Sequence, residues 1–147
     1  VFGGNGFMGY FYKYNVSGEN IIIGRVGALC GNIRYINEEK WITDNALILN
    51  LINLSKTLYS YVSYVLECAN LNALSVSNAQ PLITGTKVMN ISIAIPPLSE
   101  QKQIIDYLDK QTAKIDQAIA LKTAHIEKLK EYKSVLINDV VTGKVRV

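Results

Sequence analysis

The residues that could do catalytic chemistry are few and scattered along the chain. Residues 4–9 match the Gly-x-Gly-x-x-Gly letters of a dinucleotide-binding fingerprint, but no strand precedes them and the aromatic run of residues 10–14 follows where a helix would be needed. We interpret the pattern as a glycine-rich turn. His125, the single histidine, has no nucleophile beside it and is predicted to lie on the surface of a helix.

The cysteines and the carboxylates offer no site either. Cys30 and Cys68 stand alone, without a C-x-x-C pair or a second histidine, so we expect no metal site and no disulfide, and we interpret both as buried small apolar residues. Glu38, Glu39 and Asp44 fall in polar turns, where carboxylates are usually solvated. We therefore expect no catalytic residue, no cofactor and no metal.

A binding face remains as the function that these residue types favour. Aromatic side chains surround Lys13 in residues 10–14, and further basic residues follow in turns and short strands. Arg and Lys contact phosphates or guanine edges in nucleic acids, although any single aromatic could instead pack in the core. The candidate DNA-contacting residues are Lys13, Tyr14, Arg25, Arg34, Lys40 and Trp41.

Composition and charge set the limits of this hypothesis. The chain has 147 residues, of which 49% are apolar and 18% charged, and its apolar runs are shorter than the roughly 20 residues of a membrane span. We expect a cytoplasmic protein with no membrane partner. Of the net charge of +3, residues 1–98 carry +1, residues 99–143 carry zero, and Lys144 with Arg146 adds +2. The chain thus lacks the basic block that would identify a nucleic-acid binder on charge alone.

Residues 1–98 are predicted to form a small mixed domain of short antiparallel strands with one short helix. Apolar residues spaced by three and four over residues 56–69 predict that helix, with Ser55 as its N-cap. A glycine-punctuated stretch follows the first of the predicted strands, and a polar turn at residues 38–40 joins the second and third. The predicted strands cover residues 21–23, 32–37, 41–51, 71–76 and 87–95.

Residues 99–143 are predicted to form one long helix. Pro96-Pro97 excludes helix just before it, Ser99 is a suitable N-cap, Glu100 favours the first turn, and Gly143 is suited to end the helix. A helix of this length is roughly 60 Å long at about 1.5 Å per residue, so we expect it to project from the domain. The predicted fold class is α+β: a small mixed domain followed by a long projecting coiled-coil helix.

A heptad repeat runs through the long helix. Eight of its twelve a and d positions are apolar, and Lys122 and Lys133 interrupt the seam. A coiled coil with another helix is favoured over a helix folded back on its own domain and over a solvated single helix. The predicted interface residues are Ile105, Leu108, Ile115, Ile119, Ile126, Leu129, Leu136 and Val140.

Two parts of the chain resemble a known family. The run Ile95-Pro-Pro-Leu-Ser-Glu-Gln-Lys-Gln-Ile-Ile-Asp-Tyr-Leu-Asp, continuing to Thr142-Gly-Lys-Val, resembles the conserved region of the specificity subunit of type I restriction-modification systems. Residues 3–10, 21–32 and 41–44 are similar to the second half of that subunit's target recognition domain. Together the two parts cover nearly the whole chain.

The resemblance implies a non-catalytic role in a larger enzyme. In the family, each of two target recognition domains reads one half of a split sequence in double-stranded DNA, and two long helices pair antiparallel to set the half-site spacing. The subunit recruits modification subunits, which methylate adenine, and restriction subunits, which translocate and cleave DNA.

The present chain has one domain and one helix, so we expect a fragment of such a subunit. Residues 1–98 would be part of a target recognition domain, residues 99–143 the conserved helix, and residues 144–147 a C-terminal tail. In isolation we expect a homodimer through the helix. Two other interpretations stay open: a coiled-coil scaffold whose globular domain binds another protein, and the recognition part of a fused methyltransferase-nuclease.

Overall fold

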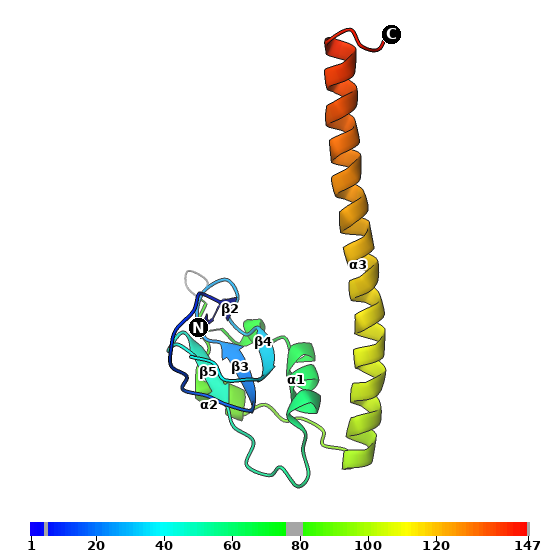
Figure 1. Cartoon of the computed structure of the whole chain (residues 1–147). Helices are drawn as coiled ribbons and strands as arrows, with labels where there is room; N and C mark the ends of the chain where they lie inside the picture. Colours follow the sequence, from blue (N-terminus) through cyan, green and yellow to red (C-terminus); the bar gives the residue numbers. More distant parts are fainter. Residues whose placement is uncertain (5, 76–80, 147) are drawn as a thin grey trace. The chain divides into compact units, whose positions relative to one another are not determined.

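The computed structural model describes residues 1–4, 6–75 and 81–146, and the chain falls into two compact units (Figure 1). Unit 1 comprises Val1–Ile105 and unit 2 comprises Asp106–Val147. The division lies inside the long helix, after Ile105: the first two turns of that helix belong to unit 1, where Ile104 and Ile105 pack against the core. No helix among the described residues is long and apolar enough to cross a membrane.

The centre of unit 1 is a three-stranded antiparallel sheet. Strand β3 (Glu19–Gly24) lies between β4 (Ile33–Asn37) and β5 (Ala46–Leu49), and Ile22 faces Arg34 on one side and Ile48 on the other. The predicted strand at residues 21–23 is confirmed. Its three consecutive isoleucines are all buried because the central strand is covered on both faces. Strands β4 and β5 do not form a hairpin with each other, since each pairs with β3.

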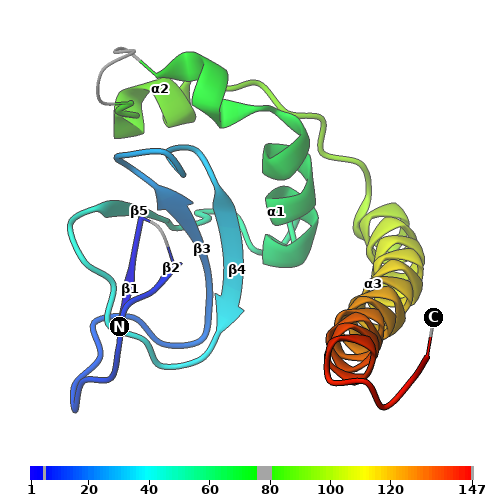
Figure 2. The same cartoon turned by 90° about the horizontal axis from the view of Figure 1, so that it is seen from above.

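One face of the sheet carries the main core. Helix α1 (Tyr59–Cys68) packs here with the short helices η1 (Leu71–Leu74) and α2 (Gly85–Met89), and Figure 2 shows α1 beside β4. The apolar positions of α1 point to the sheet, as their spacing predicts. The buried members of this core are Ile21, Ile23, Cys30, Tyr59, Tyr61, Val62, Leu66, Leu71, Ile83 and Val88.

The opposite face is covered by irregular chain and one small hairpin. Strands β1 (Phe2–Gly3) and β2 (Gly6–Phe7) pair antiparallel, so a short strand does precede Gly4 and that part of the prediction is wrong. Residues 8–15 contain no helix, as predicted, and the glycines lie in a hairpin. Gly4 is required because a Cβ there would lie 2.5 Å from the backbone oxygen of Asn45. The second core under this hairpin contains Val16, Ile22, Ile36, Ile42 and Ala46, with Phe2 packed against it.

The long helix is α3 (Leu98–Val141). It begins one residue earlier than predicted, so Ser99 lies inside the first turn and is not the N-cap, whereas Glu100 lies in the first turn as expected. Gly143 has φ +76° and ends the helix: its N–H donates to Val140 O at 3.1 Å, and the N–H of Lys144 donates to Asp139 O at 2.8 Å. These two bonds form a Schellman motif, which confirms the predicted C-terminal stop.

Four predictions of local structure in unit 1 are wrong. The strand predicted for residues 41–51 is limited to β5 (Ala46–Leu49). Helix α1 begins at Tyr59, and Ser55 does not cap it, because the Ser55 hydroxyl bonds Asn53 Oδ1 at 2.7 Å. Residues 71–74 form a 3-10 helix where a strand was predicted, while residues 76–80 lie outside the described residues. The strand predicted for residues 87–95 is replaced by the end of α2 and an extended segment without sheet pairing.

The two cysteines differ in their surroundings. Cys30 is fully buried, as predicted, and burial raises the pKa of its thiol. Cys68 ends α1 and is exposed, so its prediction as a buried residue is wrong. Neither of these cysteines forms a disulfide.

Candidate nucleic-acid interface

An exposed aromatic loop follows the β1–β2 hairpin. Tyr10 is 95% exposed and Tyr12 is 82% exposed, which excludes core packing for both rings. We define the aromatic loop as residues 7–14; its exposed large apolar side chains are Phe7, Met8, Tyr10, Phe11, Tyr12 and Tyr14. Because monomeric proteins seldom expose so many large apolar side chains together, this loop is a candidate contact surface.

Ring contacts hold parts of the loop in place. Phe7 packs edge-on between Phe2, at 5.9 Å between centroids, and Tyr10, at 5.2 Å. Phe11 packs edge-on against Trp41 at 5.1 Å. The loop is therefore tied by one ring to the hairpin and by another to the segment that follows β4, while Tyr10 and Tyr12 remain open to solvent.

The far end of the aromatic loop is fixed by polar contacts. The Asn15 side chain donates to Ile42 O at 2.8 Å and accepts from Ile42 N at 2.7 Å. Val16 and Lys40 exchange two backbone hydrogen bonds. Asn15 thus uses its amide to fix the end of the loop to Ile42, 27 residues away in sequence, and not in a local turn.

One of the predicted basic residues, Lys13, belongs to the aromatic loop, and a second, Lys40, lies beside it. Lys13 Nζ lies 5.4 Å from the centroid of the Tyr12 ring, a cation–π contact. Lys40 Nζ lies 5.3 Å from the Phe2 ring and 2.6 Å from Glu38 Oε2. Since the Glu38 carboxylate is exposed, its ion pair with Lys40 is weak and can exchange for a phosphate.

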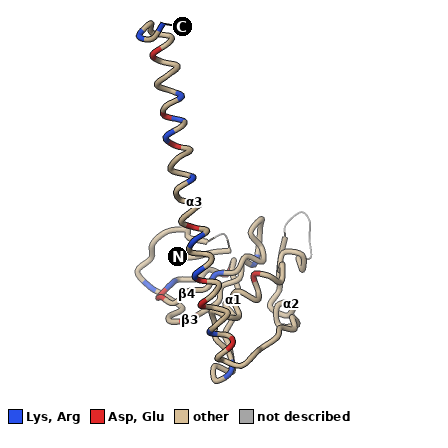
Figure 3. The backbone as a smooth tube through the Cα atoms, turned by 90° about the vertical axis from the view of Figure 1, so that its right-hand side faces the viewer, with Lys and Arg blue, Asp and Glu red and all other residues tan. Residues whose placement is uncertain are grey.

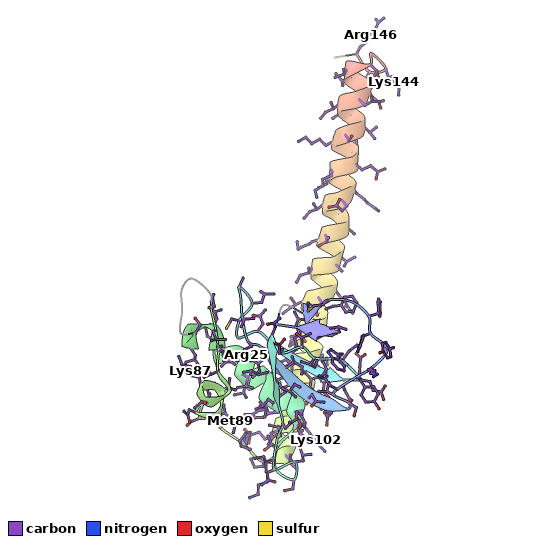
Figure 4. The ribbon with its side chains drawn as sticks, turned by 90° about the vertical axis from the view of Figure 1, so that its left-hand side faces the viewer. Arg25, Lys87, Met89, Lys102, Lys144 and Arg146 are labelled. Atoms are coloured by element: carbon purple, nitrogen blue, oxygen red, sulfur yellow. The ribbon has the colours of Figure 1, made fainter. Side chains whose placement is uncertain are left out.

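The hairpin turn lies against both predicted arginines. A Cβ at Gly6 would lie 2.8 Å from Arg34 Nη2, and a Cβ at Gly4 would lie 3.6 Å from the backbone nitrogen of Arg25. Arg25 (labelled in Figure 4) directly follows β3. Its guanidinium donates to Asp44 O at 3.4 Å. Gly6 therefore leaves room for the Arg34 guanidinium against the hairpin, whereas Gly4 makes only an ordinary contact with the Arg25 backbone.

An open depression lies between the hairpin and β4. Its volume is about 610 Å³, and its lining includes Phe2, Arg34, Tyr35 and Lys40. Tyr35 donates its hydroxyl proton to Glu19 Oε1 at 2.6 Å, and burial together with this bond and the Glu19 charge raises the pKa of Tyr35 to about 12. The phenol is thus neutral near pH 7, and the cations at this depression are Arg34 and Lys40.

Five of the six predicted DNA-contacting residues lie around the hairpin and the aromatic loop, and Arg25 lies at the Gly4 side of the hairpin. The predicted list omitted Tyr10 and Tyr12, which are more exposed than Tyr14. The sequence signal for their exposure was a dense run of aromatic residues at 10–14 that does not alternate with polar residues as a buried strand would. Which of these residues contact DNA stays a prediction.

Helix α3 carries a second exposed apolar surface. Ile115, Ile119, Ile126, Leu129 and Leu136 are 44–57% exposed, and we call these five residues the seam. Ile105 instead packs against the main core of unit 1, and Leu108 and Val140 are half-buried. Basic and acidic residues are interspersed along α3 (Figure 3), and His125 is exposed as predicted. The helix has the apolar repeat of a coiled coil, with no strong field of either sign.

Comparison with known proteins gives the class of protein that this fold and surface define. Residues 2–131 match the family model described as "Type I restriction modification DNA specificity domain". The chain belongs to this family, and the resemblance drawn from the sequence is confirmed.

Two relatives show how the chain compares with longer proteins. The type I restriction enzyme EcoprrI specificity subunit of Escherichia coli is 32% identical over 112 residues, which are 74% of this chain and 27% of that protein. The type I restriction enzyme MjaVIII specificity subunit of Methanocaldococcus jannaschii is 34% identical over 77 residues, which are 52% of this chain and 17% of that protein. The chain thus spans less than a third of the length of either relative.

Proposed function

We propose that the chain is a DNA-recognition module of a type I restriction-modification specificity subunit, and that it is a non-catalytic component. Unit 1 reads part of a target sequence in double-stranded DNA through the aromatic loop, the hairpin and the basic residues beside them. The observation that carries the proposal is the exposure of Tyr10 and Tyr12 next to Lys13 on a face held by internal contacts. Family membership supports it independently.

Each residue type on this face has a physical role in the proposal. Lys13 and Lys40 contact phosphates, where a flexible ammonium group fixes orientation without reading sequence. Arg34 is suited to a bidentate contact with guanine, because its planar guanidinium matches the two acceptors of that base. Tyr10 and Tyr12 pack against sugars and bases that approach the loop.

The net charge of +1 in residues 1–98 is too small to hold DNA by a general field. Binding through this face therefore relies on local contacts and on other parts of the assembly. The partners in the proposal are a methyltransferase (modification) subunit and a restriction subunit. Residues 1–98, 99–143 and 144–147 serve in it as recognition domain, spacer helix and tail.

Helix α3 pairs with another helix in the proposal, sets the distance between half-sites and docks the modification subunits. Two copies of the isolated chain pair through the seam. Exposed Ile and Leu at heptad spacing over many turns support this pairing, since such side chains gain free energy when another helix covers them.

The experiment compares two variants with equal loss of positive charge. The site variant carries alanine at Lys13, Arg25, Arg34 and Lys40. The control carries alanine at four exposed lysines of α3 outside the seam, Lys102, Lys110, Lys114 and Lys128. DNA affinity of the complex reconstituted with modification subunits is measured over a range of salt concentrations.

We expect the site variant to bind more weakly, with a shallower salt dependence, and the control to bind as the wild type does. Equal affinity of the site variant and the wild type would show that the face is wrongly assigned. A wild-type complex with no DNA binding would favour the coiled-coil scaffold instead.

A further inference from the structure

Gln101 is the buried polar residue of the long helix. It is 0% exposed, and among the described residues of α3 it alone is classed as buried. The heptad pattern gives Gln101 a d position on the seam side of the helix, but its side chain points into unit 1. A fully buried amide is costly unless all its polar atoms are bonded, so its partners define its role.

The amide of Gln101 makes three hydrogen bonds to backbone groups of two other segments. Its oxygen accepts from the N–H of Leu58 at 3.0 Å, and its nitrogen donates to the carbonyl oxygens of Lys56 and Pro96, each at 2.7 Å. Both donor hydrogens and the acceptor oxygen of the amide are thus used.

The first of these bonds replaces the missing cap of α1. Leu58 is the N-cap residue of α1 and has no polar side chain, and Ser55 bonds Asn53 instead. In a capping box, a Gln or Glu in the first turn of a helix accepts from the N-cap N–H of the same helix. Here Gln101 does so from a different helix, 43 residues further along the chain.

The other two bonds join the loop before α1 to the segment before α3. The Lys56 carbonyl belongs to the loop between β5 and α1, and the Pro96 carbonyl belongs to the Pro96-Pro97 pair. A single amide therefore holds both segments at the first turn of α3. The neighbouring Ile104 and Ile105 pack against the main core and complete the attachment by apolar contact.

We propose that Gln101 is a positioning residue that locks the first turn of α3 to the loop before α1. Through these three hydrogen bonds, the position of the first turn of α3 depends on the folded structure of unit 1. The effect of the lock on half-site spacing rests on the proposed function, whereas the lock itself is a property of unit 1 alone.

An amide is needed at this position because of the mixture of partners. A glutamate would keep the acceptor for Leu58 but would face the carbonyl oxygens of Lys56 and Pro96 with negative charge. A methionine has a similar length and no charge, but it satisfies none of the three groups. Both replacements release the lock for different reasons, and neither adds branched bulk.

The test uses Gln101→Glu and Gln101→Met with the control Gln103→Glu. Gln103 lies on the same turn and is exposed, so its variant carries the same charge change without a buried contact. Spin labels are attached to Cys68, which is exposed, and to cysteine introduced at Lys102 (Figure 4); Cys30 is buried. The distance distribution between the labels is measured by electron paramagnetic resonance.

We expect one narrow distance in the wild type and in Gln103→Glu, and a distribution at least twofold broader in both Gln101 variants. Fluorescence of Trp41, the single tryptophan, checks that unit 1 stays folded. If Gln101→Glu unfolds unit 1, the decision rests on Gln101→Met. A narrow distribution in Gln101→Met, equal to that of the wild type, would overturn the proposal.

A second readout separates positioning from simple stability. In the reconstituted complex, affinity for DNA with a single half-site should change less than twofold in Gln101→Met. Discrimination between the preferred spacer and one lengthened by a base pair should fall several-fold. Unchanged discrimination between spacers in Gln101→Met would overturn the coupling to half-site spacing. A wild-type complex that does not bind DNA would contradict the proposed function. In that case the label distances alone test whether Gln101 holds the first turn of α3.

Discussion

The molecule exposes two apolar surfaces of opposite character. The aromatic loop is irregular, rich in Tyr and Phe, contains Lys13, and adjoins Lys40 and Trp41. The seam of α3 is aliphatic and follows a heptad repeat. Tyrosine rings with hydroxyl groups, next to lysines, suit a hydrated and charged partner such as DNA. Branched aliphatic side chains at heptad spacing suit a second helix.

The difference teaches that exposure alone does not identify a partner. Aliphatic side chains gain about 25 cal/mol per Å² when they are removed from water, so the seam contributes to association in proportion to its buried area. The aromatic loop instead offers a few strong local contacts, since a few aromatic and Arg residues usually dominate the energy of an interface. Variants of the two surfaces should therefore fail in different assays.

The largest effect is expected at the seam. Ile119→Asp together with Ile126→Asp would place charges in the helix interface and should weaken pairing by several kcal/mol, giving monomers in analytical ultracentrifugation. Leu121→Asp is the control for one charge added away from the interface, because Leu121 is more exposed than either isoleucine and lies outside the a and d positions. If the double variant associates as the wild type does, the heptad assignment is wrong. The assignment is also wrong if the wild type is a monomer at high concentration.

The next effect is expected in the aromatic loop. Tyr10→Ala with Tyr12→Ala should lower DNA affinity of the reconstituted complex by about 2 kcal/mol, roughly 30-fold, because truncated interface aromatics commonly cost more than 1 kcal/mol each. Helix pairing should not change. Tyr107→Ala with Tyr132→Ala removes two rings of α3 that are each 64% exposed and should leave DNA affinity unchanged. Equal losses in both pairs would contradict the separation of the two surfaces.

The sequence predicted the elements whose signals are local. Glu100 in the first turn, Gly143 and the apolar repeat identified α3, and three adjacent isoleucines identified the central strand. The alternation at Ile91 and Ile93 predicted a strand wrongly, because both side chains pack against the main core while their backbone has no neighbouring strand to pair with. Alternation of apolar and polar residues indicates which side chains are buried. Whether the backbone pairs with another strand depends on the rest of the fold.

The candidate site was predictable only in part. Residue types identified the basic and aromatic positions, but whether Tyr10 is buried depends on how the hairpin and the loop fold over the sheet. The role of Gln101 was hidden for the same reason. Two of its three partners lie 43 and 45 residues away in sequence, and the heptad pattern gave it a d position instead.

A smaller effect is expected from a single lysine. Lys13→Ala should weaken DNA binding to a similar degree for all sequences and reduce the slope of log affinity against log salt by about one unit. Lys13→Arg retains the charge and should retain the slope. A change confined to one base position would show that Lys13 reads sequence and does not contact phosphate.

The smallest effect concerns the pH dependence of unit 1. Burial first, and the bond to Glu19 second, raise the pKa of Tyr35 to about 12, so the folded state holds this proton more tightly than the unfolded chain does. The stabilisation is fully present below about pH 10, the ordinary tyrosine value, and is lost as the pH rises through about 12. Because Tyr35 is 39% exposed, solvent screening limits it to about 1 kcal/mol or less.

Urea unfolding followed by Trp41 fluorescence checks this pH dependence. The stability difference between the wild type and Tyr35→Phe should narrow between pH 10 and 12. A constant difference over that range would show that the phenol proton does not contribute.

The central claim is that the two apolar surfaces have different partners. Hydroxyl-radical footprinting of the reconstituted complex, with and without target DNA, tests it most directly by comparing oxidation of Tyr10 and Tyr12 with that of Ile119 and Ile126. We predict that DNA protects the two tyrosines several-fold, whereas the two isoleucines are protected equally with and without DNA. Tyrosines that oxidise at the same rate in both states, or isoleucines that become protected only with DNA, would contradict the claim.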